Sequence, residues 1–155
     1  MGEEALLHKF FEGFKARDFQ QMASCCHPDV HFSDAVFDLT AEEVTAMWHM
    51  LCARAKDLQL VYTIGPVDSV KGHAYWEATY TFKKTGLKVH NKVNSTFYFK
   101  DGLIIKHEDD FDFWRWSRMA LGTTGFMLGW IPVFRRAFGK KAYAMLQQFI
   151  KEHPM

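Results

Sequence analysis

Five polar side chains fall on the apolar faces of segments that alternate like β-strands. They are Asp34, Asn91, Ser95, His107 and Asp109. Burying an ionisable group is costly unless it is paired or used in function. His107 and Asp109 are two positions apart, so on one strand both side chains point into the same space. Carboxylates and an imidazole in an apolar cavity are suited to general acid/base catalysis.

We predict Asp109, His107 and Asp34 as the catalytic groups. The residues predicted to line a bound ligand are Trp76, Tyr80, Asn91, Ser95, Phe97 and Phe111. The alternative is that His107 and Asp109 form a satisfied buried pair that ties the sheet to a helix. We expect no metal, because Pro28 and the strand period place His27 and His31 on no common helical face. The sequence has no phosphate-binding loop, no G-x-G-x-x-G motif and no nucleophile elbow, and we expect no cofactor.

Secondary-structure patterns show which elements must position these groups. Apolar spacing predicts a helix over 3–16, and Asp18 fits the N-cap of a short helix over Phe19–Cys25. A capping box of Thr40 and Glu43 opens a third helix that continues through Ala55. Alternation predicts strands over Val30–Phe37, Leu58–Val70 (broken at Gly65-Pro66), His73–Lys84, Lys88–Lys100 and Leu103–Phe113.

The connection between the last two strands can be predicted from side-chain parity. A two-residue turn, Asp101-Gly102, would pair Phe99 with Ile104 and set the apolar faces on opposite sides. A three-residue loop starting at Lys100 keeps both faces on one side and places Gly102 at a left-handed position. We predict this loop. It gives the pairs Phe99–Leu103, Phe97–Ile105 and Ser95–His107.

The order of these elements is that of one α+β domain, with helices on one face of a curved sheet. The chain has 155 residues and a formal charge of +1, which argues against a dedicated nucleic-acid binder. The aromatic content is high, with 15 Phe, 5 Trp and 5 Tyr. The three cysteines form no C-x-x-C pair, so we expect free thiols. The acidic N-terminus lacks a secretory pattern, and we expect a cytoplasmic protein.

The last third of the chain differs in charge from the rest. Residues 1–110 carry a net charge of −4 and residues 111–155 one of +5. The uncharged run Met119–Phe134 contains three glycines and is flanked by arginines. It favours either a lid or dimer segment that packs Phe126, Trp130 and Phe134 on the body, or a peripheral membrane contact through residues 119–136. A basic amphipathic helix is predicted over Arg135–Lys151.

Two stretches resemble the nuclear transport factor 2-like superfamily, and within it the SnoaL-like group, which is related to ketosteroid isomerases and limonene epoxide hydrolases. They are F-E-G-F-K-A-R-D-F-Q-Q-M-A-S-C-C-H-P-D-V-H-F-S-D-A-V-F, starting at Phe11, and D-G-L-I-I-K-H-E-D-D-F-D, starting at Asp101. The resemblance covers roughly residues 3–113. It implies a cone in which three N-terminal helices pack on the concave face of a curved mixed sheet. A pocket would enter from the open end, and dimerisation is frequent.

The family's functional residues match this chain unevenly. Asp34 in S-D-A-V matches the base of ketosteroid isomerases, but their oxyanion donors fall on Phe10 and Ser95. Because enolate stabilisation supplies much of the rate, we do not expect steroid isomerisation by that route. Asp109 in E-D-D-F-D matches the acid of the epoxide hydrolases, whose water-activating aspartate has no equivalent near Ala78. His107 and Asp109 match the region that SnoaL-like cyclases use for acid/base chemistry.

The resemblance therefore implies a cone domain over residues 1–113, with residues 114–155 as a helical extension of the same domain. We expect it to bind a small apolar ligand of isoprenoid, steroid or polyketide type, with isomerase, cyclase or hydrolase chemistry, and to form a homodimer. The alternative is a non-catalytic binding or dimerisation module whose C-terminal aromatic segment contacts a partner protein or a membrane.

Overall fold

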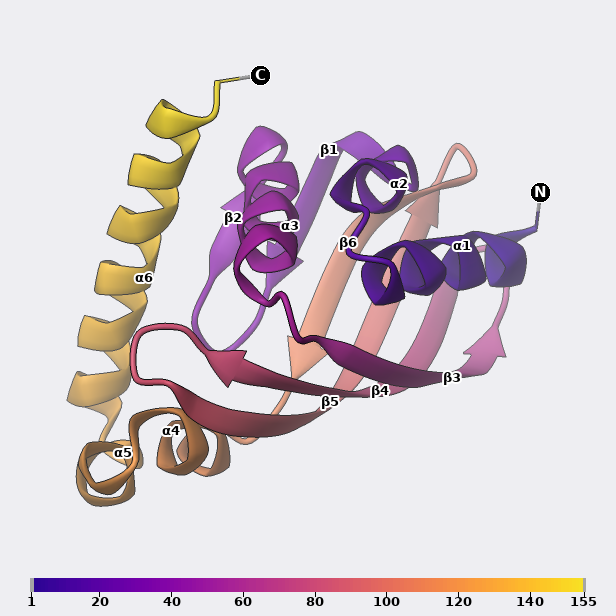
Figure 1. Ribbon diagram of the computed structural model, residues 1–155. Helices are drawn as coiled ribbons and strands as arrows, with labels where there is room; N and C mark the ends of the chain where they lie inside the picture. Colours follow the sequence, from indigo (N-terminus) through magenta and orange to yellow (C-terminus); the bar gives the residue numbers. More distant parts are fainter. Residues whose placement is uncertain (1, 155) are drawn as a thin grey trace.

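A curved six-stranded sheet carries three helices on one face (Figure 1). The computed structural model describes residues 2–154. The three helices are α1 (Glu3–Lys15), α2 (Phe19–Ser24) and α3 (Glu42–Arg54). In spatial order the strands are β2 (Asp38–Thr40), β1 (Cys26–Ser33), β6 (Leu103–Asp110), β5 (Leu87–Lys100), β4 (Lys71–Phe82) and β3 (Gln59–Val67). Only the β1–β6 pairing is parallel, so the sheet is mixed, which confirms the predicted fold class.

The core lies between α1, α3 and the concave face of the sheet. Helix α1 buries Leu7, Phe10 and Phe11 completely, and each such side chain contributes about 1.5–3 kcal/mol by leaving water. On β4 and β5 the buried residues alternate as predicted, with Trp76 and Phe97 among those facing inward. The predicted faces of these two strands are therefore confirmed.

The predicted register of the β5–β6 hairpin is wrong, although both strands do present their apolar faces to one side. The turn is the two-residue Asp101-Gly102, and both residues have positive φ, of 55° and 73°. It pairs Phe99 with Ile104, and Ile105 is then an extra residue that forms a β-bulge. The extra residue within β6, and not a third loop residue, therefore keeps the apolar side chains of both strands on the same face of the sheet. The resulting inward pairs are Ser95–Asp109 and Phe97–His107.

Strand β1 ends at Ser33, earlier than predicted, so Asp34 lies in a turn and not on a strand face. The Asp34 carboxylate accepts hydrogen bonds from the backbone N–H of Val36 and of Phe37, each at 2.7 Å, and this local turn replaces the strand ladder. The chain then reverses into the short strand β2, which the sequence pattern did not indicate.

The capping box at α3 is only half formed. Ala41 is the N-cap of the helix, and the Thr40 side chain makes no capping bond. The carboxylate of Glu43 does accept the backbone N–H of Thr40, at 3.4 Å. Strand β6 also ends earlier than expected, at Asp110, because Asp112 caps the next helix by accepting the Arg115 N–H at 3.1 Å.

The C-terminal extension forms α4 (Phe113–Leu121), α5 (Thr123–Leu128) and α6 (Pro132–Glu152). Helix α6 lies along α3 and buries Leu146 and Phe149 in the main core (Figure 1). The prediction that Phe126 and Trp130 pack on the body is wrong, since their exposed fractions are 58% and 66%. None of the helices within residues 2–154 combines the length and the apolar character needed to cross a membrane.

Candidate functional site

A chain of four hydrogen-bonded side chains crosses the concave face of the sheet. The Trp76 indole Nε1–H donates to Ser95 Oγ at 2.7 Å, and the Ser95 hydroxyl donates to Asp109 Oδ1 at 2.5 Å. His107 Nε2 lies 2.6 Å from the same Asp109 oxygen. The register shift explains this geometry, because Ser95 lies directly opposite Asp109 and not opposite His107 as predicted.

The His107–Asp109 pair is almost completely buried, with side-chain exposures of 3% and 4%. With Asp109 ionised, His107 donates from Nε2, and Oδ1 accepts two hydrogen bonds. The other carboxylate oxygen, Oδ2, receives no hydrogen bond from the described part of the chain. Oδ2 is therefore the oxygen that a ligand could use.

Aromatic rings enclose the His107 imidazole on several sides. Phe97 is 4.3 Å away between ring centroids, Phe32 is 5.0 Å away and Phe10 is 5.6 Å away. Trp48 of α3 stacks on the imidazole at 5.8 Å, with 19° between the planes. Such an enclosure strengthens the hydrogen bonds of the pair, since little water competes for them.

Trp48 carries an unusual polar group. Its indole Nε1 is the single fully buried side-chain nitrogen or oxygen without a hydrogen-bond partner among residues 2–154. An orphaned buried donor costs about 1–3 kcal/mol. No sequence signal indicated that the Trp48 ring would stack on His107.

Asp34 lies close enough to the pair for their charges to act on it. Burial raises the pKa of Asp34 to about 6, the nearby Asp109 carboxylate adds to the rise, and the two backbone hydrogen bonds and His107 oppose it. Burial likewise raises the pKa of Tyr80, and the Asp34 charge adds to this effect. Asp34 is therefore near enough to Asp109, His107 and Tyr80 for the charges of these groups to influence one another.

The remaining predicted lining residues lie around this region. Asn91 is buried on the same face of β5 and makes no side-chain hydrogen bond within residues 2–154. Phe97 packs on His107, whereas Phe111 lies beyond the end of β6 and contacts both the main core and a second apolar cluster. His90 is exposed and lies 2.6 Å from the carboxylate of Glu77.

The second apolar cluster covers the end of the cone where Tyr80 and Phe111 lie, and we call it the cover. Its buried members are Val89, Phe113, Trp116 and Ala120. The Trp116 indole donates to the Tyr80 hydroxyl at 2.9 Å, and Phe138 of α6 packs on the Trp116 ring at 5.3 Å. The sequence patterns did not assign Trp116 or Phe138 to the site. Their only signal was the aromatic enrichment of the tail.

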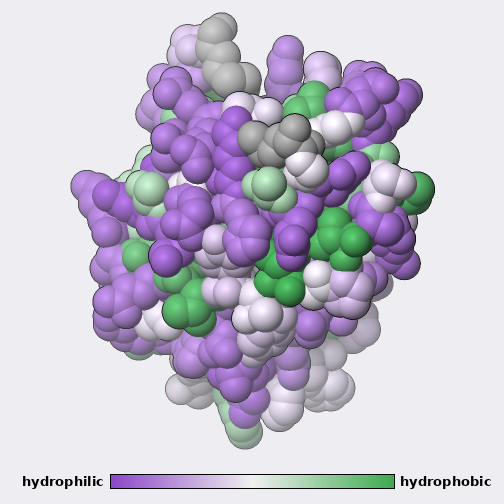
Figure 2. Space-filling model, turned by 90° about the vertical axis from the view of Figure 1, so that its right-hand side faces the viewer, coloured by the Kyte–Doolittle hydropathy of each residue, from purple (hydrophilic) through white to green (hydrophobic). Residues whose placement is uncertain are grey.

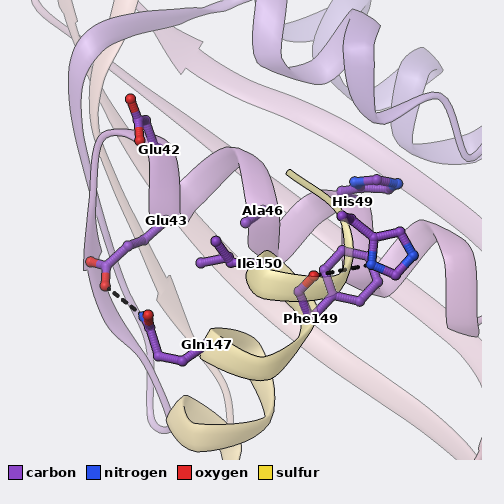
Figure 3. Close-up of a pocket in the computed structure, with 8 residues that line it drawn as sticks. Glu42, Glu43, Ala46, His49, Gln147, Phe149 and Ile150 are labelled. Carbon is purple, nitrogen blue, oxygen red and sulfur yellow. Dashed lines mark hydrogen bonds between the residues drawn. The ribbon is translucent and has the colours of Figure 1, made fainter. Parts of the chain in front are cut away.

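Two surface grooves lie away from the buried pair. One, of about 310 Å³, lies between α3 and α6, where Glu43 and Gln147 point toward each other and hydrogen-bond at 3.1 Å (Figure 3). The other, of about 520 Å³, lies beside β1 and the start of α3. Neither groove is lined by His107, Asp109 or Asp34. The residues predicted as catalytic therefore lie apart from both of these grooves.

Solved structures with similar folds share this architecture. A candidate polyketide cyclase from Silicibacter sp. TM1040 superposes with a TM-score of 0.65 and 18% identity, over 77% of this chain and 95% of the other. AclR, a candidate hydroxylase from Streptomyces galilaeus, gives 0.60 and 17%, over 71% and 78%. An epoxide hydrolase of the LEH-like type from M. tuberculosis gives 0.58 and 15%, over 84% and 92%. At these identities the likeness shows the fold alone.

No curated protein sequence matches the chain. A family model, however, matches residues 7–107, which extend from α1 to the buried histidine of β6. This span contains the helices and strands of the cone and ends just before Asp109. The chain therefore belongs to the SnoaL-like domain family.

Proposed function

We propose that this protein binds a small apolar, cyclic molecule of isoprenoid, steroid or polyketide type in the cone and acts on it by acid/base chemistry. Asp109 is the acid/base group, through its free Oδ2. His107 is the hydrogen-bond partner that orients this carboxylate, and Asp34 is a second carboxylate beside it. The observation that carries the proposal is the convergence of Ser95 and His107 on one oxygen of a buried carboxylate while the other oxygen stays free.

The surroundings support a ligand that is mainly apolar. The rings of Phe97, Phe111 and Tyr80 offer apolar surface, and Asn91 offers an amide without a hydrogen-bond partner in the described residues. The chemistry named for the similar structures, polyketide cyclisation and epoxide hydrolysis, also depends on positioned acids and bases. Acid/base catalysis of this kind contributes typically about 10²–10⁴-fold to a rate.

Ligand entry in this proposal requires the cover to move. Trp116 is held by ring packing and by its hydrogen bond to Tyr80, and α4 is followed by Gly122, which has a φ of 63°. A glycine in the left-handed region gives a helix end that other residues rarely adopt. The C-terminal extension would then be a lid on the cone.

The substitution Asp109→Asn tests the proposal, with Asp110→Asn as its matched control on the exposed side of the same strand. The probes are limonene oxide, progesterone and an aromatic polyketide ester, measured by thermal shift and by product formation. We expect Asp109→Asn to lower turnover of an accepted probe by about 10²-fold or more, because the amide cannot exchange a proton as a carboxyl does. Asp110→Asn should behave as wild type.

Two outcomes would contradict the proposal. One is that Asp109→Asn unfolds the protein while no probe shifts the melting temperature of the wild type, which would make the pair structural. The other is equal turnover in both variants.

A further inference from the structure

The largest concentration of exposed apolar side chains lies on α5, the turn that follows it and the first turn of α6, and we call it the α5 patch. Its members are Phe126, Met127, Leu128, Trp130 and Val133, with exposed fractions of 58%, 62%, 39%, 66% and 65%. Exposed apolar residues that stand alone need no explanation, whereas a contiguous group marks a contact surface. Other exposed large apolar residues, such as Val61 and Val70, are separated along the chain.

The α5 patch is held firmly against helix α4. Helix α5 packs so closely on α4 that a Cβ atom at Gly125 would lie 1.8 Å from the Ser117 carbonyl oxygen. The Trp114 indole also donates to the Phe126 carbonyl oxygen at 3.1 Å. The patch is thus a fixed feature of the fold and not a loose loop.

Unneutralised basic side chains surround the patch. Residues 119–134 contain no charged side chain, and Arg118, Arg135 and Arg136 flank them directly. The Arg118 guanidinium lies 4.2 Å from the centre of the Trp114 ring, and all three arginines are exposed. None of them forms an ion pair with a carboxylate of residues 2–154.

We propose that the α5 patch is a peripheral binding site for an anionic lipid bilayer. Apolar rings that include a tryptophan, bordered by arginines, match the boundary between acyl chains and negatively charged headgroups. A second copy of the chain is a poorer match, because a symmetric interface over this patch would bring the arginines of one copy against those of the other. This proposal concerns a surface distinct from the buried pair and does not rest on the proposed catalysis.

The opposite end of the molecule has a different character. Figure 2 shows the α1 and β3 side as largely hydrophilic, with apolar residues in small separate groups. Val70 lies in the turn between β3 and β4, at that end of the sheet (Figure 1). Val70 and Val133 are exposed to nearly the same extent, 64% and 65%. They therefore form a matched pair for testing the patch.

The test is flotation of the full chain with phosphatidylcholine vesicles that contain or lack phosphatidylserine. We expect the wild type and Val70→Asp to float with the phosphatidylserine vesicles and Val133→Asp to stay behind. Val133 is in the first turn of α6, where an added aspartate suits the helix dipole, so the fold should be preserved. Replacing Arg135 and Arg136 by glutamine should weaken partitioning by about fivefold for each charge removed.

A fluorescence measurement provides a second test on the unmodified chain. Trp130 is the most exposed indole, so insertion should shift the emission of the wild type to the blue, and Trp130→Phe should abolish most of that shift. Three results would overturn the proposal. The first is that the wild type fails to float, the second that it floats equally with both vesicle types, and the third that Val70→Asp and Val133→Asp lose vesicle binding to the same extent. A change of oligomeric state in Val133→Asp without any vesicle binding by the wild type would assign the patch to self-association instead.

Discussion

Burying the polar side chains of this hydrogen-bonded chain costs free energy, and the hydrogen bonds among them offset that cost. The Asp109 side chain is only 4% exposed, and Ser95 and His107 both hydrogen-bond to one of its oxygens. Removing one partner of such a buried pair leaves an uncompensated group and is strongly destabilising. At the scale of single residues, the site is therefore both a candidate catalytic centre and a part of the core.

Asp34 gives a prediction about pH. Its pKa is about 6 in the folded protein, raised by burial from the ordinary value of 3.8. The folded state thus keeps a proton that the unfolded chain releases, so the contribution of Asp34 to stability is complete below pH 3.8 and is lost as the pH rises through 6. Above that range the cost is on the order of 2–3 kcal/mol.

The substitution Asp34→Asn should remove this pH dependence, because the amide oxygen can still accept the two backbone hydrogen bonds but carries no charge. The measurement is the free energy of unfolding in urea at several pH values between 4 and 7, compared between wild type and variant. We expect the difference between the two proteins to grow in favour of the variant as the pH rises. A difference that stays constant with pH would contradict the burial of Asp34 as a charged group.

Among the elements, the β5–β6 hairpin decides which side chains meet in the site. Its two-residue turn places Asp101 in the left-handed region, with a φ of 55°. The bulge at Ile105 then sets Ser95 opposite Asp109. Without this bulge the two-residue turn would pair Ser95 with Glu108, and His107 and Asp109 would lie on the other face of the sheet.

The left-handed conformation of Asp101 can be tested by a pair of substitutions. Asparagine tolerates this conformation and alanine does not, so Asp101→Ala should be less stable than Asp101→Asn by about 1 kcal/mol. Both variants lose the Asp101 charge and with it the contact between Asp101 and His27. This contact therefore does not contribute to the difference in stability between them. Equal urea midpoints in the two variants would favour a three-residue loop, in which residue 101 has an ordinary helical conformation.

The whole molecule combines the cone with a C-terminal extension that contributes to the same core. Leu146 of α6 is fully buried and belongs to the main core cluster, and Tyr143 donates a hydrogen bond from its hydroxyl to Glu43 of α3 at 2.5 Å. A Cβ atom at Gly139 would lie 3.0 Å from the carbonyl oxygen of Val36, so α6 also approaches the turn that holds Asp34. These contacts predict that residues 1–113 and 114–155 unfold as one unit.

The test is Leu146→Ala, compared with Met145→Ala at the neighbouring exposed position. We expect Leu146→Ala to lower the free energy of unfolding by about 2–5 kcal/mol through the cavity it leaves, and Met145→Ala to change it by less than about 0.5 kcal/mol. Fluorescence of the buried tryptophans and circular dichroism should report a single shared transition. The alternative is that fluorescence and circular dichroism report two separate transitions and that Leu146→Ala changes only the one followed by circular dichroism. That result would mean that the extension folds independently.

Local sequence patterns were enough to predict which side chains share a face. The two-residue alternation of the strands placed Ser95, Phe97, His107 and Asp109 in one space, because the direction of a side chain on a strand is a local property of the backbone. The fold class also followed from local periodicity together with the resemblance of two stretches to a known family. The N-terminal helices and long strands were predicted correctly for the same reason.

How these groups meet, and which helices close over them, depends on the packing of the whole chain. The bulge at Ile105, the pairing of Ser95 with Asp109 and the stacking of Trp48 on His107 depend on contacts between segments far apart in the chain. The same holds for the raised pKa of Asp34, which results from burial by other parts of the fold. Local sequence preferences do not include such long-range packing. The sequence therefore indicated a cluster of ionisable groups, but neither the pairing of the strands that carry it nor the helices that cover it.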